Sequence, residues 1–162
     1  MVRSVVYDNR DLPIQVVDAL GAKIQTVYDA VGNPVMVTDN VGRVTHFRYD
    51  ELDRLIEVED STGRVFKKEY FSDDVVQALT DAAGRRTSFS YDQANRVRAI
   101  EPPAGSVAQV QFNWDEAYQL TQDRLPGGTR RDYQYDDAGR MTKITYVGSG
   151  SPGNRNMVYD AN

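Results

Sequence analysis

The chain has 162 residues, which is enough for one domain with a hydrophobic core. It carries 24 acidic and 19 basic residues, and its net charge of −5 argues against non-specific binding to nucleic acid or to an anionic membrane. It has no cysteine and no apolar run of transmembrane length, so disulfide frameworks, thiolate metal sites and a membrane-spanning helix are excluded.

Aromatic residues, mostly within Tyr-Asp pairs, recur along the chain at nearly constant intervals. The successive starts are Tyr7, Tyr28, Tyr49, Tyr70, Tyr91, Trp114, Tyr135 and Tyr159. The first five starts are 21 residues apart, and the later steps are 23, 21 and 24 residues. A period in this range predicts a repeat architecture in which each unit stacks on its neighbours. We therefore expect a single array over residues 1–162, with about seven units.

The first turn of each unit is predicted four residues after the start, where residues that tolerate a left-handed backbone recur. They are Asp11, Gly32, Asp53, Asp74, Asn95 and Gly139. The exception is Tyr118. Because unit five is two residues longer and ends just before Trp114, we expect the Tyr118 turn to be reshaped so that Tyr118 has an ordinary φ.

The second turn of each unit is predicted fourteen residues after the start, where glycine recurs. The glycines are Gly21, Gly42, Gly63, Gly84, Gly105 and Gly128, and Ser149 takes this place in the seventh unit. Asp18, Asp39, Asp60 and Asp81 stand three residues before the glycine. Asp-x-x-Gly is typical of turns, because the carboxylate accepts a backbone hydrogen bond and glycine adopts a φ that other residues resist.

The segments between the turns are predicted to be strands. Residues 45–49, 87–91, 110–114 and 131–135 alternate with period two and are rich in aromatic and β-branched residues. In the outgoing strands the apolar residues are three apart, as in Leu55 and Val58. We expect the first of each pair to belong to the turn or to precede a β-bulge. No segment has a helical pattern.

These motifs resemble the YD repeat, also called the Rhs repeat. The resemblance rests on Tyr28-Asp29-Ala30-Val31-Gly32-Asn33, on Tyr135-Asp136-Asp137-Ala138-Gly139-Arg140, and on the Asp-x-x-Gly-Arg segments 39–43 and 81–85. It covers the chain from Tyr7 to Asn162. It implies an all-β fold of tandem antiparallel hairpins of about 21 residues, joined into one long, twisted, spiralling sheet. In Rhs proteins, Tc toxins and teneurins such sheets form hollow shells, and in the bacterial members the shell encloses a toxin domain.

Four units depart from this pattern. Unit four opens with Tyr70-Phe71, unit five contains Pro102-Pro103, unit six opens with Trp114-Asp115, and unit seven contains the loose segment 148–153. These departures affect local hairpin geometry rather than the repeat assignment.

The expected length of the sheet limits what the chain does alone. About 14 strands at about 4.8 Å spacing form a ribbon about 67 Å long. Closed with a strand tilt of about 40°, it would have a radius of about 14 Å and would be filled largely by its own side chains. Because a domain of about 100 residues has a radius of gyration of about 13 Å, we expect this chain to be a wall segment.

No residue pattern predicts a catalytic, cofactor-binding or metal-binding site. His46 is the single histidine, it lies mid-strand opposite the aromatic row, and we interpret it as a surface residue. The aspartates lack the nine-residue period of calcium-binding β-rolls and fit Asx-turns better. Asp73-Asp74 and Asp136-Asp137 are expected in solvated turns.

The serines and the chain's proline motifs also give no sign of catalysis. Ser106, Ser149 and Ser151 lack a nucleophile elbow. Rhs proteins often cleave themselves at an Asp-Pro motif, which does not occur here, so this activity is not carried over. We therefore expect no enzymatic turnover.

Two functions remain. The first is a non-catalytic scaffold, a wall segment of a shell that encapsulates or carries a toxin or effector domain. The second is a module that binds carbohydrate or another cell-surface ligand through its aromatic rows. Carbohydrate-binding hairpin repeats are rich in adjacent aromatics, whereas here only Tyr70 and Phe71 are adjacent. This difference favours the scaffold.

The partners expected are the rest of a longer repeat shell or an enclosed toxin or effector domain, with carbohydrate as the alternative, and neither nucleic acid nor a membrane span. Because no capping residues stand at either end, we expect an excerpt of a longer array, or a protein that completes its sheet against another chain, and we expect the edge strands of the isolated chain to self-associate. No signal peptide follows Met1. The resemblance implies a secreted or cell-surface location within a larger bacterial protein.

Overall fold

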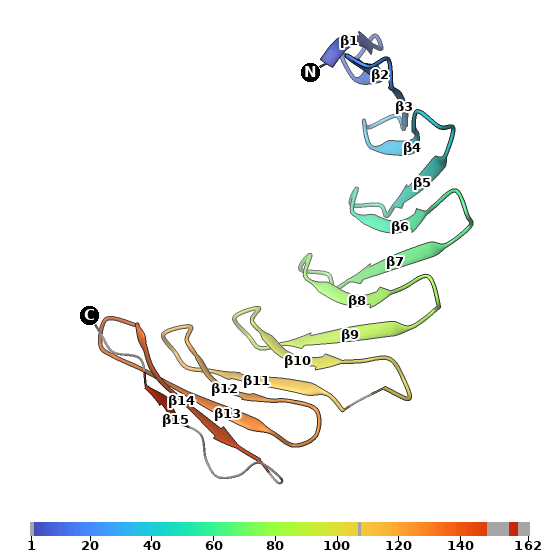
Figure 1. Ribbon diagram of the computed structural model, residues 1–162. Helices are drawn as coiled ribbons and strands as arrows, with labels where there is room; N and C mark the ends of the chain where they lie inside the picture. The colour runs from blue at the N-terminus through green and yellow to red at the C-terminus, as the bar shows by residue number, and fades with distance from the viewer. Residues whose placement is uncertain (1, 107, 149–155, 159–162) are drawn as a thin grey trace. The chain divides into compact units, whose positions relative to one another are not determined.

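The computed structural model describes residues 2–106, 108–148 and 156–158. These residues form fifteen β-strands and no helix, so the predicted all-β class is confirmed (Figure 1). Within this described part no helix is long and apolar enough to cross a membrane. The chain divides into two compact units, Met1–Glu69 with Leu79–Arg85 and Tyr70–Ala78 with Arg86–Asn162.

The first unit is an antiparallel sheet of consecutive hairpins. Its strands are β1 (Val2–Tyr7), β2 (Pro13–Asp18), β3 (Lys23–Tyr28), β4 (Pro34–Thr38), β5 (Val44–Tyr49), β6 (Leu55–Glu59) and β7 (Val65–Tyr70). Each strand from β1 to β6 pairs with the next one in the chain. Strand β8 (Val76–Thr80) contributes residues to both units.

The second unit repeats this arrangement. Its strands are β9 (Arg86–Tyr91), β10 (Val97–Glu101), β11 (Val110–Trp114), β12 (Leu120–Arg124), β13 (Arg130–Tyr135), β14 (Met141–Val147) and β15 (Asn156–Val158). Neighbours in sequence are again antiparallel partners. Such order follows from the short connections, because turns of a few residues can join only adjacent antiparallel strands.

A β-bulge recurs next to the turn that follows each Tyr-Asp start. In the β5–β6 hairpin Tyr49 pairs with Leu55 and Arg48 with Glu57, which leaves Ile56 as the extra residue. The same shift occurs in β1–β2, β3–β4, β9–β10, β11–β12 and β13–β14. The bulge brings Leu55 and Val58 to one face despite their odd spacing. The predicted bulge is therefore confirmed.

Alternation along the strands gives each sheet an aromatic face and a polar face. In β5 the aromatic face carries Phe47, which is half-buried, whereas the polar face carries the exposed His46. In β11 the corresponding residues are Phe112 and the exposed Gln111. The names aromatic face and polar face are used below for the faces that carry these residues.

Few side chains are fully covered, because each unit is a single sheet. Among the described residues the buried ones are Ala78, Ala99, Ile144 and Asp123. Several large apolar side chains of the first unit stay partly open, including Ile24 at 47% and Phe66 at 43% exposure. The stability of each unit therefore rests on its hydrogen-bonded ladder and on contacts along the faces, without a closed core.

The turn residues adopt the predicted left-handed backbone. All six described glycines of the second turn have φ between 75° and 87°, and the first-turn residues Asp11, Asp53, Asp74 and Asn95 have φ between 57° and 67°. The expectation for Tyr118 is wrong. Its φ is 63°, and its amide donates to the Asp115 carbonyl at 3.3 Å as in the other first turns. The Ser149 turn lies outside the described residues.

Candidate functional site

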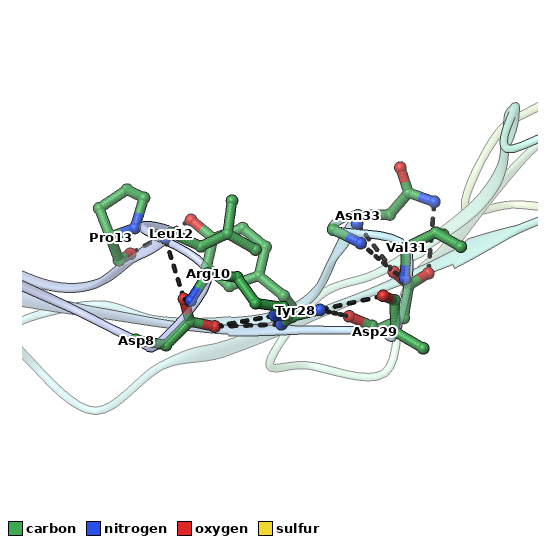
Figure 2. A network of polar contacts seen from close by, with 10 residues as sticks. Asp8, Arg10, Leu12, Pro13, Tyr28, Asp29, Val31 and Asn33 are labelled. Carbon is green, nitrogen blue, oxygen red and sulfur yellow. Dashed lines mark hydrogen bonds and ion pairs between the residues drawn. The ribbon is translucent and has the colours of Figure 1, made fainter.

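The Tyr-Asp turn is held by its own aspartate, as Figure 2 shows for Asp8. Asp8 Oδ1 accepts hydrogen bonds from the amides of Arg10 and Leu12, both at 2.9 Å, and Oδ2 pairs with Arg10 Nη2 at 3.1 Å. These donors, with the Leu12 amide as the largest contribution, lower the pKa of Asp8. The carboxylate therefore serves as the hydrogen-bond acceptor that closes this turn.

Adjacent Tyr-Asp turns are also joined to one another. Arg10 Nη1 donates to the carbonyls of Asp29 at 2.7 Å and Ala30 at 3.1 Å (Figure 2). Further along the same unit, Asn33 Nδ2 donates to Asp53 Oδ1 at 2.9 Å. These hydrogen bonds connect neighbouring first turns at the ends of the strands in the first unit.

The start residue itself links successive repeats. Tyr28 donates its hydroxyl hydrogen bond to the Pro13 carbonyl at 3.2 Å, fifteen residues earlier (Figure 2). The same bond joins Tyr49 to Pro34, Tyr91 to Val76 and Tyr135 to Leu120, and the Trp114 indole reaches Val97 at 2.8 Å. The slot thus requires a large ring with a donor at its tip, which tyrosine and tryptophan share. Sequence analysis found the period but missed this reason for it.

Turns of both types carry the same bonding between an aspartate and the arginine four residues later, here called the turn staple. Asp60 Oδ1 accepts from the amides of Thr62 at 2.9 Å and Arg64 at 3.1 Å, and Oδ2 accepts from Arg64 Nε at 2.7 Å. The hydroxyl of Thr62 and the side chain of Arg64 lower the pKa of Asp60. Asp–Arg staples also close the turns at Asp39, Asp50, Asp81, Asp92 and Asp136.

Tyr118 keeps its left-handed conformation beside a cation. The Arg96 guanidinium lies 5.0 Å from the centre of the Tyr118 ring and 5.9 Å from that of Trp114. Arg96 Nη1 also donates to the Asp115 carbonyl at 2.6 Å. A cation–π contact of this kind is worth about 0.5–1 kcal/mol at an exposed site, which offsets part of the left-handed strain. The motif could not reveal this contact, since Arg96 belongs to the preceding repeat.

One ion pair on the aromatic face of the second unit has a buried aspartate and a partly exposed arginine. Asp123 is 2% exposed, and both its carboxylate oxygens accept hydrogen bonds from Arg131. Tyr133 donates its hydroxyl hydrogen bond to Asp123 Oδ2 at 3.1 Å. Burial, together with the Asp123 charge, raises the pKa of Tyr133 to about 12, and the hydrogen bond to Asp123 raises the pKa of Arg131. No feature of the repeat pattern singled out Asp123.

The polar face of the second unit carries a network of amide and charged side chains. Asn113 donates to Gln122 at 3.2 Å, Gln122 donates to Asp132 at 2.9 Å, and Arg130 pairs with Asp132 at 2.8 Å. A hollow of about 240 Å³ lies beside it, lined by Ser90, Arg98, Ala99, Gln109, Gln111, Phe112 and Asn113. Its lining offers hydrogen-bonding groups but no nucleophile paired with a base.

The residues weighed from sequence lie apart from one another. His46 is exposed on β5, opposite Met36 and Glu59. Asp74 and Asp136 belong to turns, as expected, and Ser106 is exposed in the β10–β11 turn. In the described part of the chain no three His, Asp or Glu side chains gather to hold a metal ion. Ser149 and Ser151 lie outside the described residues.

Comparisons with known proteins agree with this geometry. The sequence model of the RHS Repeat family matches residues 28–65, 73–107 and 114–151, more than half of the chain. A search of curated proteins found no match.

Similar folds occur in solved toxin structures. A Photorhabdus luminescens Tc holotoxin pore with a TccC3 mutation aligns at TM-score 0.79 and 16% identity, over 95% of this chain and 9% of that one. A TcdB2–TccC3 crystal structure aligns at 0.56 and 13% identity, over 94% and 12%. A TcdB2–TccC3 structure without the hypervariable C-terminal region aligns at 0.52 and 15% identity, over 85% and 10%. The chain therefore spans about a tenth of the chains it matches.

Proposed function

The chain belongs to the RHS repeat family, and from this premise we propose that it is a wall segment of a shell that encloses or carries a toxin or effector domain. The observation that carries the proposal is the identical joint between repeats. Tyr49 bonds to Pro34, and Tyr135 to Leu120, with the same bulge beside each. A joint that recurs every repeat allows a sheet to be extended unit by unit.

The exposure of the aromatic face supports the same proposal. Ile24 and Phe66 remain more than two-fifths open to solvent, and the described residues form no enclosed core. A face of this kind gains stability when further polypeptide covers it. An enclosed domain, or other parts of a longer shell, would supply that cover. The proposed protein is bacterial and secreted or displayed at the cell surface, and the segment itself performs no catalysis.

Deletion of one period tests the modular wall. Removing residues 44–64 takes out 21 residues and leaves the alternation of the two turn types intact, whereas removing residues 44–54 deletes about half a period and places two turns of the same type in succession. We expect the first variant to keep a cooperative thermal transition and the second to lose it. If both variants unfold alike, the repeats do not act as interchangeable wall elements.

Encapsulation is tested in the longer reading frame that contains this segment. We expect limited proteolysis to spare the enclosed domain while the shell is intact and to cleave it once denaturant opens the shell. Equal cleavage of that domain under both conditions would contradict the enclosure. For the isolated chain, light scattering should show association that grows with concentration, because the edge strand β1 pairs with β2 alone in the described structure.

The hollow near Asn113 keeps a carbohydrate-binding function as the second candidate. Amide side chains, a serine and Arg98 line it, and such groups can donate to sugar hydroxyls. A glycan array probed with the chain and with Asn113→Ala distinguishes the two functions. Specific binding that is lost in the variant supports carbohydrate recognition, and no binding leaves the scaffold as the function.

A further inference from the structure

One cross-strand pair of residues on the aromatic face, here called a rung, occurs at the same position in successive repeats. The opposed pairs are Val16 and Ile24, Val37 and Thr45, Val58 and Phe66, and Ile100 and Val110. In the β12–β13 hairpin the same rung holds Asp123 opposite Arg131. An ion pair with a buried aspartate therefore replaces an otherwise uncharged contact at this one junction among those with described pairing.

The turn of the same hairpin lacks the turn staple. Leu125 stands in the place of the turn aspartate and Thr129 in that of the arginine. The backbone bonds remain, from the Leu125 amide to the Thr129 carbonyl at 2.8 Å and from the Gly128 amide to the Leu125 carbonyl at 3.2 Å. Since neither side chain can form an ion pair, this turn lacks the Asp–Arg contact that fastens the turns at Asp39, Asp60 and Asp81.

In this hairpin the acidic and the basic residue both lie within the strands instead of in the turn. Asp123 lies two residues before Leu125, and Arg131 lies two residues after Thr129. The β10–β11 turn, where Pro102 and Pro103 replace the usual sequence, shows a related arrangement: Gln109 donates to Glu101 across the hairpin at 2.9 Å. Among the described hairpins closed by a second turn, these two lack a turn aspartate, and in each a polar pair eight residues apart bridges the strands, on the polar face for Glu101 and on the aromatic face for Asp123.

We propose that the Asp123–Arg131 pair is a register lock, which replaces the missing turn staple and selects the native pairing of β12 with β13. A slip of two residues keeps each side chain on its own face, so the alternation of apolar and polar residues does not oppose it. In the slipped pairing the buried Asp123 would lose Arg131, and an unpaired buried charge is strongly unfavourable. The turn keeps Pro126 and Gly127 at its centre and both backbone bonds, so the pair acts together with the turn in selecting the register.

A role in pairing specificity explains why charges stand at a buried position. Replacing both members of a buried ion pair with apolar residues is often neutral or stabilising, whereas removing one is destabilising. Relative to the uncharged pair Val37 and Thr45 of the repeat that starts at Tyr28, the ion pair therefore adds little to the free energy of unfolding. What it adds is a penalty against every alternative register.

Disulfide trapping tests the lock, because the chain has no cysteine of its own. Gln122 and Asp132 are partners on the polar face, so Q122C/D132C reports the native register. A slip of two residues would bring Gln122 opposite Gln134 or Arg130, which Q122C/Q134C and Q122C/R130C report. We measure the ratio of native to slipped cross-links under oxidising conditions that allow exchange.

Each cysteine pair is placed in three backgrounds. With Asp123 and Arg131 present, we expect the native cross-link to dominate. The double variant D123V/R131T introduces the residue types found at Val37 and Thr45. We expect its fraction of slipped cross-links to rise about tenfold or more, with an unchanged melting temperature. Adding L125D/T129R restores a turn staple and should return the ratio towards its original value.

Two controls separate the lock from a general loss of structure. The pair E57C/K67C reports the register of β6–β7, whose turn keeps its staple, and should not respond to D123V/R131T. An unfolded double variant would lose both reports and would overturn the proposal, because it would make the pair a requirement for stability. A folded double variant with an unchanged ratio would also overturn it.

Discussion

The hairpins β6–β7 in the first unit and β12–β13 in the second each have an Asp–Arg ion pair that joins their two strands, but the two pairs lie at different depths. In β6–β7 the Asp60–Arg64 pair lies in the turn, with the arginine side chain 64% exposed. In β12–β13 the Asp123–Arg131 pair lies inside the strands, with the aspartate 2% and the arginine 31% exposed. Depth changes the consequence of the pair, since Asp60 is 23% exposed and partly solvated, whereas Asp123 is buried and depends on Arg131 for its compensation.

The largest expected effect comes from breaking the inner pair. Arg131→Met leaves the Asp123 carboxylate buried without its cation, and we expect the free energy of unfolding to fall by about 3 kcal/mol. Arg130→Met is the matched control, because Arg130 pairs with Asp132 on the polar face, where both side chains are about a third exposed. Chemical denaturation should show a loss below about 1 kcal/mol for this control. Equal losses would remove the distinction of depth.

The turns that both kinds of hairpin share are tested at Gly139. Its φ is 78°, and an added Cβ would lie 3.1 Å from the side-chain nitrogen of Gln119. Gly139→Val should therefore lower the free energy of unfolding by about 1–2 kcal/mol, measured by thermal melts. Ala138→Val is the control, since valine occupies the equivalent place at Val31. A harmless Gly139→Val would show that the turn does not require a left-handed residue.

Lowering the pH tests how much the turn carboxylates contribute to stability, because protonation removes their charge and leaves neutral contacts unchanged. The Arg43 amide and side chain lower the pKa of Asp39, and the Arg85 side chain and amide lower that of Asp81. A lowered folded pKa contributes stability above the unfolded value of about 4, and this is lost as the pH falls through the folded pKa. Melting temperatures should therefore be flat from about pH 7 to 5 and fall below about pH 4. In Asp39→Asn the starting value should be lower and the acid decline smaller.

The smallest expected effect is at Tyr118. Tyr118→Gly removes left-handed strain of about 1 kcal/mol and also removes a cation–π contact of about the same size, so the melting temperature should hardly change. In an Arg96→Met background the contact is already absent, and the same substitution should stabilise the chain by about 1 kcal/mol. A clear loss of stability in both backgrounds would mean that Tyr118 makes contacts beyond Arg96.

The sequence by itself determined the repeat, the turns and the strands. Turn chemistry is local: an aspartate bonds amides two and four residues away, and a residue such as Asn95 carries its backbone preference wherever it stands. The alternation that places Phe47 and His46 on opposite faces is local as well. Local rules therefore sufficed for the fold class and for the positions of the hairpins.

The tertiary structure decided what depends on residues brought together from neighbouring repeats. The reason for tyrosine at the start positions is a carbonyl fifteen residues away, and Tyr118 is tolerated because Arg96 lies beneath its ring. Asp123 looked like one more polar residue of an irregular unit until the register placed it opposite Arg131. A charge becomes costly or useful only once burial is known, and burial is a property of the assembled sheet rather than of the segment that carries the charge.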